Sequence, residues 1–375
     1  MVEKRHTETF SSSHYEKTVS EMRTRGEKVH DAGQKVYRET GKLDPMVDIK
    51  GKTRESRNAF IDNGNNTCLL TKGIKMPVVS CGDGTGSMGE NVGKVFFGMK
   101  KLFDMLSPFQ LRYQIDLSVA VVQDVQDKHP VFQMAQFESS NLAAEHVTKL
   151  IPDKDGGDSD EDYDLGLCYI NDRVNIDINQ YCLKGYLFII ADACGRGRVL
   201  ASDVKNHLGY EIQSRSIYTK KICQELLKKW HVFFIQINSS YPTSSWWSDL
   251  LGDNRVIFGC DADYLAELQA GLMYITETEE PLETSFIAFL QASGNNKISD
   301  YDAKKIWQII QPAKPLFGAQ AKLDVFNNIP KPGDIFSHYR NPWPIGHARE
   351  SENPTTNSVV TTPSIDSNEV DWTKF

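Results

Sequence analysis

Residues 78–89 read VVSCGDGTGSMG, an apolar segment that runs directly into a loop of glycine and small polar side chains. The apolar segment begins at Met76, and from Val92 onwards apolar residues recur at spacings of three and four until Pro108. The first pattern predicts a buried strand and the second predicts an amphipathic helix. Open α/β sheets bind their ligands at loops of this kind, so the function depends on what this loop holds.

The alternation of strand and helix continues through the middle of the chain. Continuous apolar segments predict strands, and segments with apolar residues along one face predict helices. Strands are expected at 76–81, 115–122, 131–138, 186–192, 231–238 and 255–260, and helices at 92–106, 142–151, 162–173, 217–230 and 262–275. Turn-forming residues between the second and third strands indicate a hairpin. The sequence therefore predicts an α/β fold with a doubly wound, mostly parallel central sheet, one antiparallel edge strand and helical extensions.

The segments on either side of this alternating block differ from it in composition. The predicted division is an N-terminal helical and irregular arm at 1–73, the alternating block at 74–278, a C-terminal helical extension at 279–340 and a disordered tail at 341–375. In the extension, Ser299 and Asp302 form a partial capping box at the start of a predicted helix. The tail is rich in Pro, Ser, Thr and Asn and has few apolar residues to bury.

The bulk composition argues against several classes of protein. The chain has 375 residues, a formal net charge of −8 and a sequence pI of about 5.7. Nucleic-acid binding would need a basic stripe, and no apolar run reaches the ~18 residues of a membrane span. The seven cysteines form no CxxC pair, and those in apolar segments are expected to be buried thiols. We therefore expect a cytoplasmic protein with neither a nucleic-acid nor a membrane partner.

One interpretation of the loop is a dinucleotide site, because residues 84–89 match the pattern G-x-G-x-x-G. That fingerprint also requires an acidic residue at the end of the second strand, about 20 positions further on, to bind the ribose. The nearest such acid is Asp124, which lies well beyond that spacing. Asp83, beside the expected pyrophosphate, would also repel it. The dinucleotide interpretation is therefore disfavoured.

A second interpretation is a phosphotransferase or phosphatase with the motif D-x-D-G-T, in which the first Asp is the nucleophile. Here residues 81–85 read CGDGT, so Cys81 occupies the nucleophile position. The nine histidines are scattered singly, without a metal-binding spacing. The sequence supplies no positive sign of a catalytic base.

The third interpretation is a metal site of the form D-x-T-x-S. Asp83, Thr85 and Ser87 would place one carboxylate and two hydroxyl oxygens on one side of an ion. Mg²⁺ prefers oxygen ligands of this kind, and the intervening glycines let the backbone curl tightly. A plain strand-to-helix connection would contain similar residues, so the loop alone does not decide between the two.

Two later segments offer further oxygens at the same expected edge of the sheet. Residues 156–159, GGDS, precede a predicted helix and supply the hydroxyl of Ser159. Residues 189–192, IIAD, end a buried strand with the carboxylate of Asp192. Because the carboxyl ends of parallel strands share one edge, these segments favour the metal interpretation.

With DGTGS at 83–87, GGDS at 156–159 and IIAD at 189–192, the chain resembles the von Willebrand factor A domain family over residues 74–278. In that family the three segments form a metal-ion-dependent adhesion site. The resemblance implies a site for Mg²⁺ or Mn²⁺, with Ca²⁺ as a further candidate. The ligands that it implies are Asp83, Thr85, Ser87, Ser159 and Asp192.

The chain departs from the family pattern in two positions. Thr85 stands where serine is commoner, which keeps the oxygen and adds a methyl group. Ser159 stands where threonine is usual, and its neighbours Asp158 and Asp160 could each add a carboxylate to the site. Such an addition would change the metal preference.

The resemblance implies a metal-dependent protein-interaction module and not an enzyme. Hydroxyl ligands leave the ion with uncompensated positive charge, which favours an Asp or Glu carboxylate from a protein partner. A role as a subunit or adaptor of a larger intracellular assembly, such as an ATPase assembly, fits this expectation. The alternative is a metal-dependent hydrolase that acts on a phosphate or nucleotide.

Two other features have simpler explanations. The acidic segment 153–164 lacks the Gly and Glu that an EF-hand requires at its sixth and twelfth positions, so a solvated acidic loop is expected. The pair Trp246–Trp247 could contact a partner, but packing beneath a long loop is the favoured interpretation.

Overall fold

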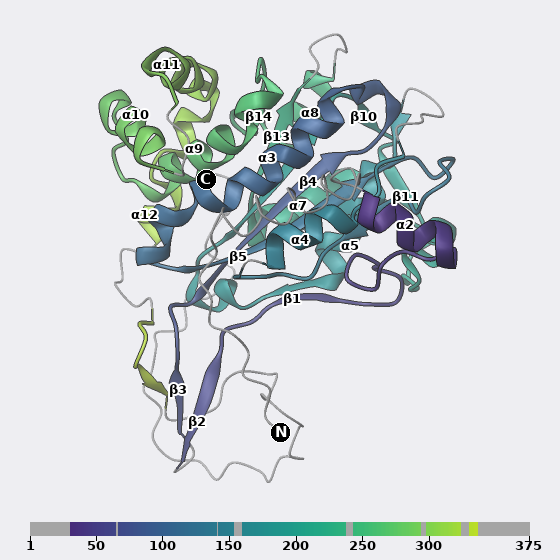
Figure 1. The fold of residues 1–375 in the computed structure, drawn as a ribbon, viewed down its shortest axis with the longest axis horizontal. Helices are drawn as coiled ribbons and strands as arrows, with labels where there is room; N and C mark the ends of the chain where they lie inside the picture. Colours follow the sequence, from purple (N-terminus) through teal and green to yellow (C-terminus); the bar gives the residue numbers. More distant parts are fainter. Residues whose placement is uncertain are drawn as a thin grey trace.

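A computed structural model describes residues 31–64, 67–140, 142–153, 160–237, 243–293, 298–323 and 330–336. Its central element is a six-stranded sheet with the strand order β14-β13-β9-β4-β5-β6 (Figure 1). The strands are β4 (Lys75–Asp83), β5 (Gln114–Val122), β6 (Phe132–Met134), β9 (Gly185–Ala191), β13 (Trp230–Gln236) and β14 (Val256–Ile257). β6 pairs antiparallel with β5, and the other pairs are parallel. The predicted mixed α/β class, the mostly parallel sheet and the antiparallel edge strand are confirmed.

Helices flank the sheet because its strands are apolar on both sides. Successive residues of β4 show this, since Val78 belongs to one hydrophobic core and Val79 to the other. The first core includes the buried residues of α3 (Asn91–Met105) and α9 (Leu265–Glu277), and the second includes those of α5 (Tyr163–Arg173) and α7 (Thr219–Lys229). This double burial holds the strand ends, and the loops that follow them, in fixed positions.

The structure has further helices and strands. The other α-helices are α2 (Asp31–Thr40), α4 (Leu142–Lys149), α6 (Ala201–Asp203), α8 (Ser244–Leu251), α10 (Glu283–Ala292), α11 (Asp300–Ile309) and α12 (Ala319–Leu323). The minor strands are β1 (Arg54–Ser56), β2 (Phe60–Gly64), β3 (Thr67–Leu70), β7 (Asp160–Glu161), β8 (Val174–Ile176), β10 (Cys194–Gly195), β11 (Arg198–Leu200), β12 (Ser216–Tyr218) and β15 (Ile335–Phe336). Short 3₁₀ helices are Gly86–Met88, Ser107–Leu111, Asp177–Tyr181, Asp253–Arg255, Ala262–Tyr264 and Gln311–Leu316, and Val204–Leu208 is a π-helix.

Part of the predicted N-terminal arm packs on the alternating block. β1 pairs parallel with β8, and the buried Arg54 donates from Nε to the Met134 carbonyl oxygen over 2.8 Å and from Nη2 to the Asp48 carbonyl oxygen over 2.8 Å. Burial lowers the pKa of Arg54. β2 and β3 form a three-stranded sheet with β15 that extends away from the main sheet (Figure 1). The domain boundary at residue 73 stays a prediction.

The C-terminal extension is helical, and one of its helices begins at Asp300, where the sequence predicts a helix start. Ser299 caps α11, since its Oγ accepts a hydrogen bond from the Asp302 backbone N over 3.0 Å. α10, α11 and α12 lie together beside α9 (Figure 1). Aromatic contacts join these helices to the alternating block. The ring centroids of Tyr274 on α9 and Phe289 on α10 lie 4.5 Å apart.

Several details differ from the sequence expectations or complete them. β6 and β14 are shorter than predicted, because the pairing that defines each strand involves few residues. α8 was not predicted, and it buries Trp247 completely against Phe234. Trp247 Nε1 donates to the Ala193 carbonyl oxygen over 3.0 Å, so this residue packs beneath the rim of the sheet, as the favoured interpretation held. All seven cysteines are free, and no helix in the described ranges is long and apolar enough to cross a membrane.

Candidate functional site

The two predicted carboxylate ligands meet at the carboxyl edge of the central sheet. Asp83 is the last residue of β4, and Asp192 directly follows β9. These strands are parallel neighbours, with Gly82 opposite Ile190. Both carboxylates are fully buried, at 0% exposure. The sheet therefore brings together two acids that are more than a hundred positions apart in the sequence.

The loop after β4 connects these carboxylates through hydroxyl groups. Thr85 donates to Asp83 Oδ1 from its backbone N over 2.8 Å and from its Oγ1 over 2.6 Å. Thr85 Oγ1 lies 3.2 Å from Ser87 Oγ, which in turn donates to Asp192 Oδ1 over 2.9 Å. The result is an unbroken row of side-chain oxygens across the ends of two strands. Ser159, the remaining predicted ligand, lies outside the described residues, and its role stays a prediction.

Close packing explains two of the glycines here, Gly82 near the end of β4 and Gly84 in the loop. A Cβ atom at Gly82 would lie 2.6 Å from Val95 Cγ1 on α3, and one at Gly84 would lie 2.6 Å from Val121 Cγ2 on β5. Either contact is too short for carbon atoms, so a side chain at these positions would push the loop away from the sheet. The glycines thus hold Asp83 and Thr85 against the strand ends.

The row of oxygens suits a small divalent cation. Mg²⁺ holds oxygen ligands at about 2.0–2.1 Å in octahedral geometry, so neighbouring ligands lie about 3 Å apart. The distances along the row, from 2.6 to 3.2 Å, are those of hydrogen bonds, and they are also compatible with that spacing. No group of three or more His, Cys, Asp or Glu side chains in the described part of the chain is arranged to hold a metal ion. A cation at this site would therefore depend on the hydroxyl oxygens as well as on the two carboxylates.

The raised pKa of Asp83 is also consistent with a cation site. Burial raises the pKa of Asp83 to about 6, while hydrogen bonds from Thr85 and Tyr163 oppose this effect and the nearby charge of Asp192 adds to it. Two buried carboxylates side by side repel each other unless a positive charge lies between them. A bound cation would supply that charge.

Tyr163 is a site residue that the sequence did not reveal. It begins α5, is 1% exposed, and donates from its hydroxyl to Asp83 Oδ2. Oδ2 is thereby engaged, while Oδ1 faces Thr85 and the row of oxygens. No spacing rule connects a tyrosine at the start of one helix with an aspartate at the end of a distant strand.

Glu161 is a second residue that the sequence did not reveal. Its side chain is 3% exposed, and Oε2 has no hydrogen-bond partner among the residues that the structure describes. Burial raises the pKa of Glu161 to about 9; the charges of Asp83 and Asp124 add to the rise, and a hydrogen bond with the Thr85 side chain opposes it. A buried polar atom without a partner costs about 1–3 kcal/mol, so the burial of Glu161 destabilises the fold.

Arg196 joins the loops around the site. Its Nε donates to Asp162 Oδ1 over 2.9 Å, its Nη2 donates to Asp124 Oδ2 over 2.7 Å, and its backbone N donates to Asp164 Oδ2 over 2.6 Å. The pairing of β7 with β10 ties the same two loops through their backbones. The guanidinium thus offsets part of the negative charge at this edge.

This network corrects the expectation of a solvated acidic loop at 153–164. Glu161, Asp162 and Asp164 are 3%, 5% and 2% exposed. Burial is possible because Arg196 neutralises Asp162 and because Thr219 Oγ1 donates to Asp164. Residues 154–159 of the segment lie outside the described ranges.

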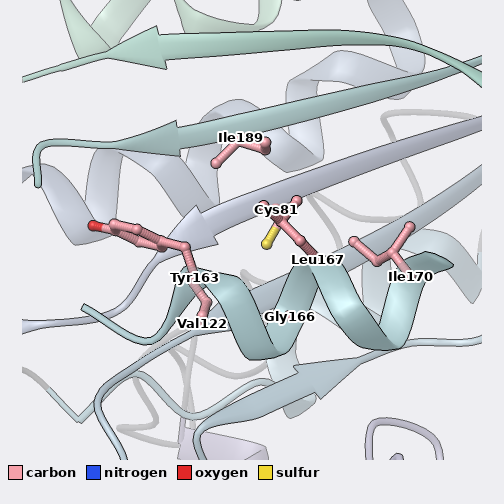
Figure 2. Close-up of a pocket in the computed structure, with 7 residues that line it drawn as sticks. All are labelled: Cys81, Val122, Tyr163, Gly166, Leu167, Ile170 and Ile189. Atoms are coloured by element: carbon pink, nitrogen blue, oxygen red, sulfur yellow. The ribbon is translucent and has the colours of Figure 1, made fainter. Parts of the chain in front are cut away.

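A small cavity lies behind the site, between the sheet and α5 (Figure 2). It offers about 10 Å³, and its lining is almost entirely apolar. The residues around it are Cys81, Val122, Tyr163, Gly166, Leu167, Ile170 and Ile189. That volume is about the least that holds one water molecule, so this cavity does not accommodate a nucleotide.

Comparisons with known proteins supply distant structural similarities only. No protein-family model matches the sequence, and no curated protein matches it. The chain is similar to a pilus adhesin, SpaC from Lactobacillus rhamnosus GG, with 13% identity and a TM-score of 0.37 over 60% of this chain and 35% of that one. It is also similar to proximal thread matrix protein 1 from the mussel byssus, with 10% identity and a TM-score of 0.34 over 53% of this chain and 47% of that one.

A von Willebrand factor type A protein from Catenulispora acidiphila has 14% identity and a TM-score of 0.31, over 60% of this chain and 51% of that one. The chain thus spans about a third to a half of the length of these three structures. Similarities at this level carry no functional conclusion, so the function has to be argued from the site.

Proposed function

We propose that the chain contains a doubly wound, von Willebrand A-like domain that binds Mg²⁺ or Mn²⁺ at its rim and, through the ion, a carboxylate of a protein partner. The observation that carries the proposal is the row of oxygens from Asp83 through Thr85 and Ser87 to Asp192, at the spacing of ligands around a small cation. The cytoplasmic location and the place in a larger assembly stay predictions of the sequence.

The residues of the row would have two different roles in binding the ion. Asp83 and Asp192 supply two negative charges, and the hydroxyls of Thr85 and Ser87 supply neutral oxygens that leave the ion able to attract one more anion. Asp83 and Thr85 are fully buried, whereas Ser87 is partly exposed. A partner would therefore approach over Ser87.

Two neighbouring residues would fix the positions of the ligands and of the loops that carry them. Tyr163 holds Asp83 Oδ2, which leaves Oδ1 toward the ion. Arg196 holds Asp124 and Asp162 and so fixes the loops on either side. Partners that orient the ligands of a metal commonly determine its affinity.

The surroundings of His231 favour binding over hydrolysis. This histidine of the central sheet pairs with Tyr186 near the amino end of β13, whereas Asp192 follows the carboxyl end of β9. It is 2% exposed and hydrogen-bonded to Gln320 Oε1 over 2.9 Å, and burial lowers its pKa to about 3. It is therefore not placed to activate a water molecule at the site.

Calorimetric titration with Mg²⁺ and Mn²⁺ tests the metal site. The wild type should bind one ion, and Asp83→Asn should remove binding, because an amide oxygen lacks the charge of the carboxylate that it replaces. Glu225→Gln is the matched control, since it removes an exposed carboxylate on α7. Binding by Asp83→Asn at the affinity of the wild type, or no binding by the wild type, contradicts the proposal.

Partner capture tests the second half of the proposal. Capture should occur in Mg²⁺ and fail in EDTA, and Thr85→Val should weaken capture strongly, because the variant lacks one of the oxygen ligands of the ion that binds the partner's carboxylate. Far-UV circular dichroism establishes that the variant is folded. Equal capture in Mg²⁺ and EDTA would show that the partner binds elsewhere.

A further inference from the structure

The short strands β11 and β12 form an antiparallel ribbon beside α5 (Figure 1). Both ends of this ribbon are fixed on one carboxylate of α5. The Arg196 backbone N, just before β11, donates to Asp164 Oδ2 over 2.6 Å. The hydroxyl of Thr219, just after β12, donates to Asp164 Oδ1. Asp164 directly follows Tyr163, whose hydroxyl holds Asp83, so the ribbon has a fixed position relative to the row of oxygens.

The outer face of the ribbon carries an exposed aromatic ring beside a positive charge. Arg198 and Tyr218 are register partners in the antiparallel pair, so their side chains lie on the same face. Leu200 shares that face, because side chains alternate along a strand and the intervening Val199 is 2% exposed. Tyr218 is 70% exposed and Leu200 is 38% exposed. The face thus offers an anchor of the kind that protein interfaces use.

Positive charge is concentrated around this ribbon. Residues 196–221 contain six Lys or Arg and two acids, in a chain whose formal net charge is −8. One of the two acids, Glu211, is already paired with Lys205 over 2.8 Å. The exposed cations without an ion-pair partner among the residues that the structure describes are Arg198, Arg215, Lys220 and Lys221. Together with Leu200 and Tyr218, these four cations form the basic patch.

Two cations of the basic patch are unfavourable for the fold itself. Lys220 and Lys221 lie in the first turn of α7. The helix dipole disfavours positive charge at that end, and the two like charges are adjacent. Helix stability therefore does not explain these lysines, whereas an anion bound to the patch would compensate their charge.

We propose that the basic patch binds an acidic segment of the same protein partner whose carboxylate the ion would hold. The inference rests on the proposed function and adds a second contact to it. An Arg guanidinium can bind a carboxylate through two parallel hydrogen bonds. A three-residue strand is about 10 Å long, so the ribbon fits a short extended peptide. A nucleic acid, which gains affinity from many phosphate contacts, is disfavoured because the ribbon is short and continuous with a site for carboxylates.

Fluorescence anisotropy of a labelled peptide of alternating Glu and Ser, titrated with the full chain in Mg²⁺, tests the inference. The wild type should bind this Glu peptide and bind a Gln and Ser peptide much more weakly. The double variant Arg198→Glu/Lys221→Glu should bind the Glu peptide at least about fivefold more weakly, the loss that marks an important interface residue. Tyr218→Ala should show a loss of similar size. No binding of the Glu peptide by the wild type would overturn the inference.

The matched control is the double variant Lys205→Glu/Lys228→Glu, which changes the net charge equally at exposed lysines outside the patch. Its affinity for the Glu peptide should stay near that of the wild type. Equal losses in the two double variants, or no loss in the patch variant, would overturn the inference. Circular dichroism checks folding, and Arg198→Gln/Lys221→Gln replaces the patch variant if the latter does not fold.

Two other probes test the class of partner. A labelled oligothymidylate and vesicles of phosphatidylcholine with phosphatidylserine are titrated under the same conditions. The Glu peptide should bind more tightly than either. If one of these probes binds at least as tightly as the Glu peptide and the patch variant loses that binding, the assignment to a protein segment is overturned.

Repeating the peptide titrations in EDTA separates the inference from the proposed function. If the wild type binds the Glu peptide equally in Mg²⁺ and EDTA while the patch variant still loses affinity, metal-dependent binding is wrong and the role of the patch is supported. If EDTA removes affinity while the patch variant binds like the wild type, metal-dependent binding is supported and only the inference is wrong.

Discussion

Replacing Tyr163 by Phe tests how the buried Asp83 is held. The substitution removes only the hydroxyl that donates to Asp83 Oδ2 and keeps the ring, which packs 5.8 Å from the ring of Trp247. Asp83 is fully buried and, with a pKa of about 6, is mostly ionised at neutral pH. The change therefore leaves a buried carboxylate oxygen without its donor.

The expected cost follows from the type of bond that is lost. A hydrogen bond to a charged group contributes about 1.5–3 kcal/mol, compared with about 0.5–1.5 kcal/mol for one between neutral groups. Tyr163→Phe should thus lower the free energy of unfolding by about 1.5–3 kcal/mol in the absence of metal. It should also weaken Mn²⁺ binding by about 10–100-fold, because the carboxylate is no longer held with Oδ1 toward the ion.

A second tyrosine on the same helix provides the control. Tyr169 lies on α5, and its hydroxyl donates to the neutral Lys52 carbonyl oxygen over 3.2 Å, away from the rim. Urea unfolding and Mn²⁺ titration of Tyr163→Phe and Tyr169→Phe are compared at the same pH. Tyr169→Phe should lose less stability and keep the wild-type affinity for Mn²⁺. If the two variants behave alike, Tyr163 has no special part in holding Asp83 and the reasoning is refuted.

Two further predictions concern acid stability and the rim. His231 has a pKa of about 3 in the folded chain against an ordinary 6.5, so the unfolded state binds its proton first. The contribution of His231 to stability should fall by about 1.4 kcal/mol for each pH unit between about 6.5 and 3. Urea unfolding at about pH 7 and pH 5 should therefore show a smaller decrease, or a larger increase, for His231→Gln than for the wild type, and equal changes would contradict this. Arg196→Gln should lose about 1–3 kcal/mol of stability, less than a fully buried pair because Arg196 is 31% exposed, and should weaken Mn²⁺ binding. Lys205→Gln, which changes an exposed side chain, is the control in the same two assays. If Arg196→Gln and Lys205→Gln behave alike, the Arg196 network does not stabilise the rim.

Much of the fold could be predicted because its signals are local. The apolar run of β4 and the three- and four-residue spacing of α3 depend only on neighbours in the chain. The helix α8 was missed because its eight residues, SSWWSDLL, are too few for a pattern to repeat, and the burial of Trp247 against Phe234 stabilises it. Packing partners from distant segments leave no mark on a local pattern.

The sequence by itself determined the alternation of strands and helices and the expectation that Asp83 and Asp192 share an edge, because parallel strands end on the same side of a sheet. It also placed Thr85 and Ser87 beside Asp83, since all three lie on one turn. Only the tertiary structure decided that Tyr163 holds Asp83 and that Glu161 is buried at the same edge of the sheet. The physical reason is that these contacts arise where α5 packs on the sheet and where β7 pairs with β10, and both join segments that are distant in the chain.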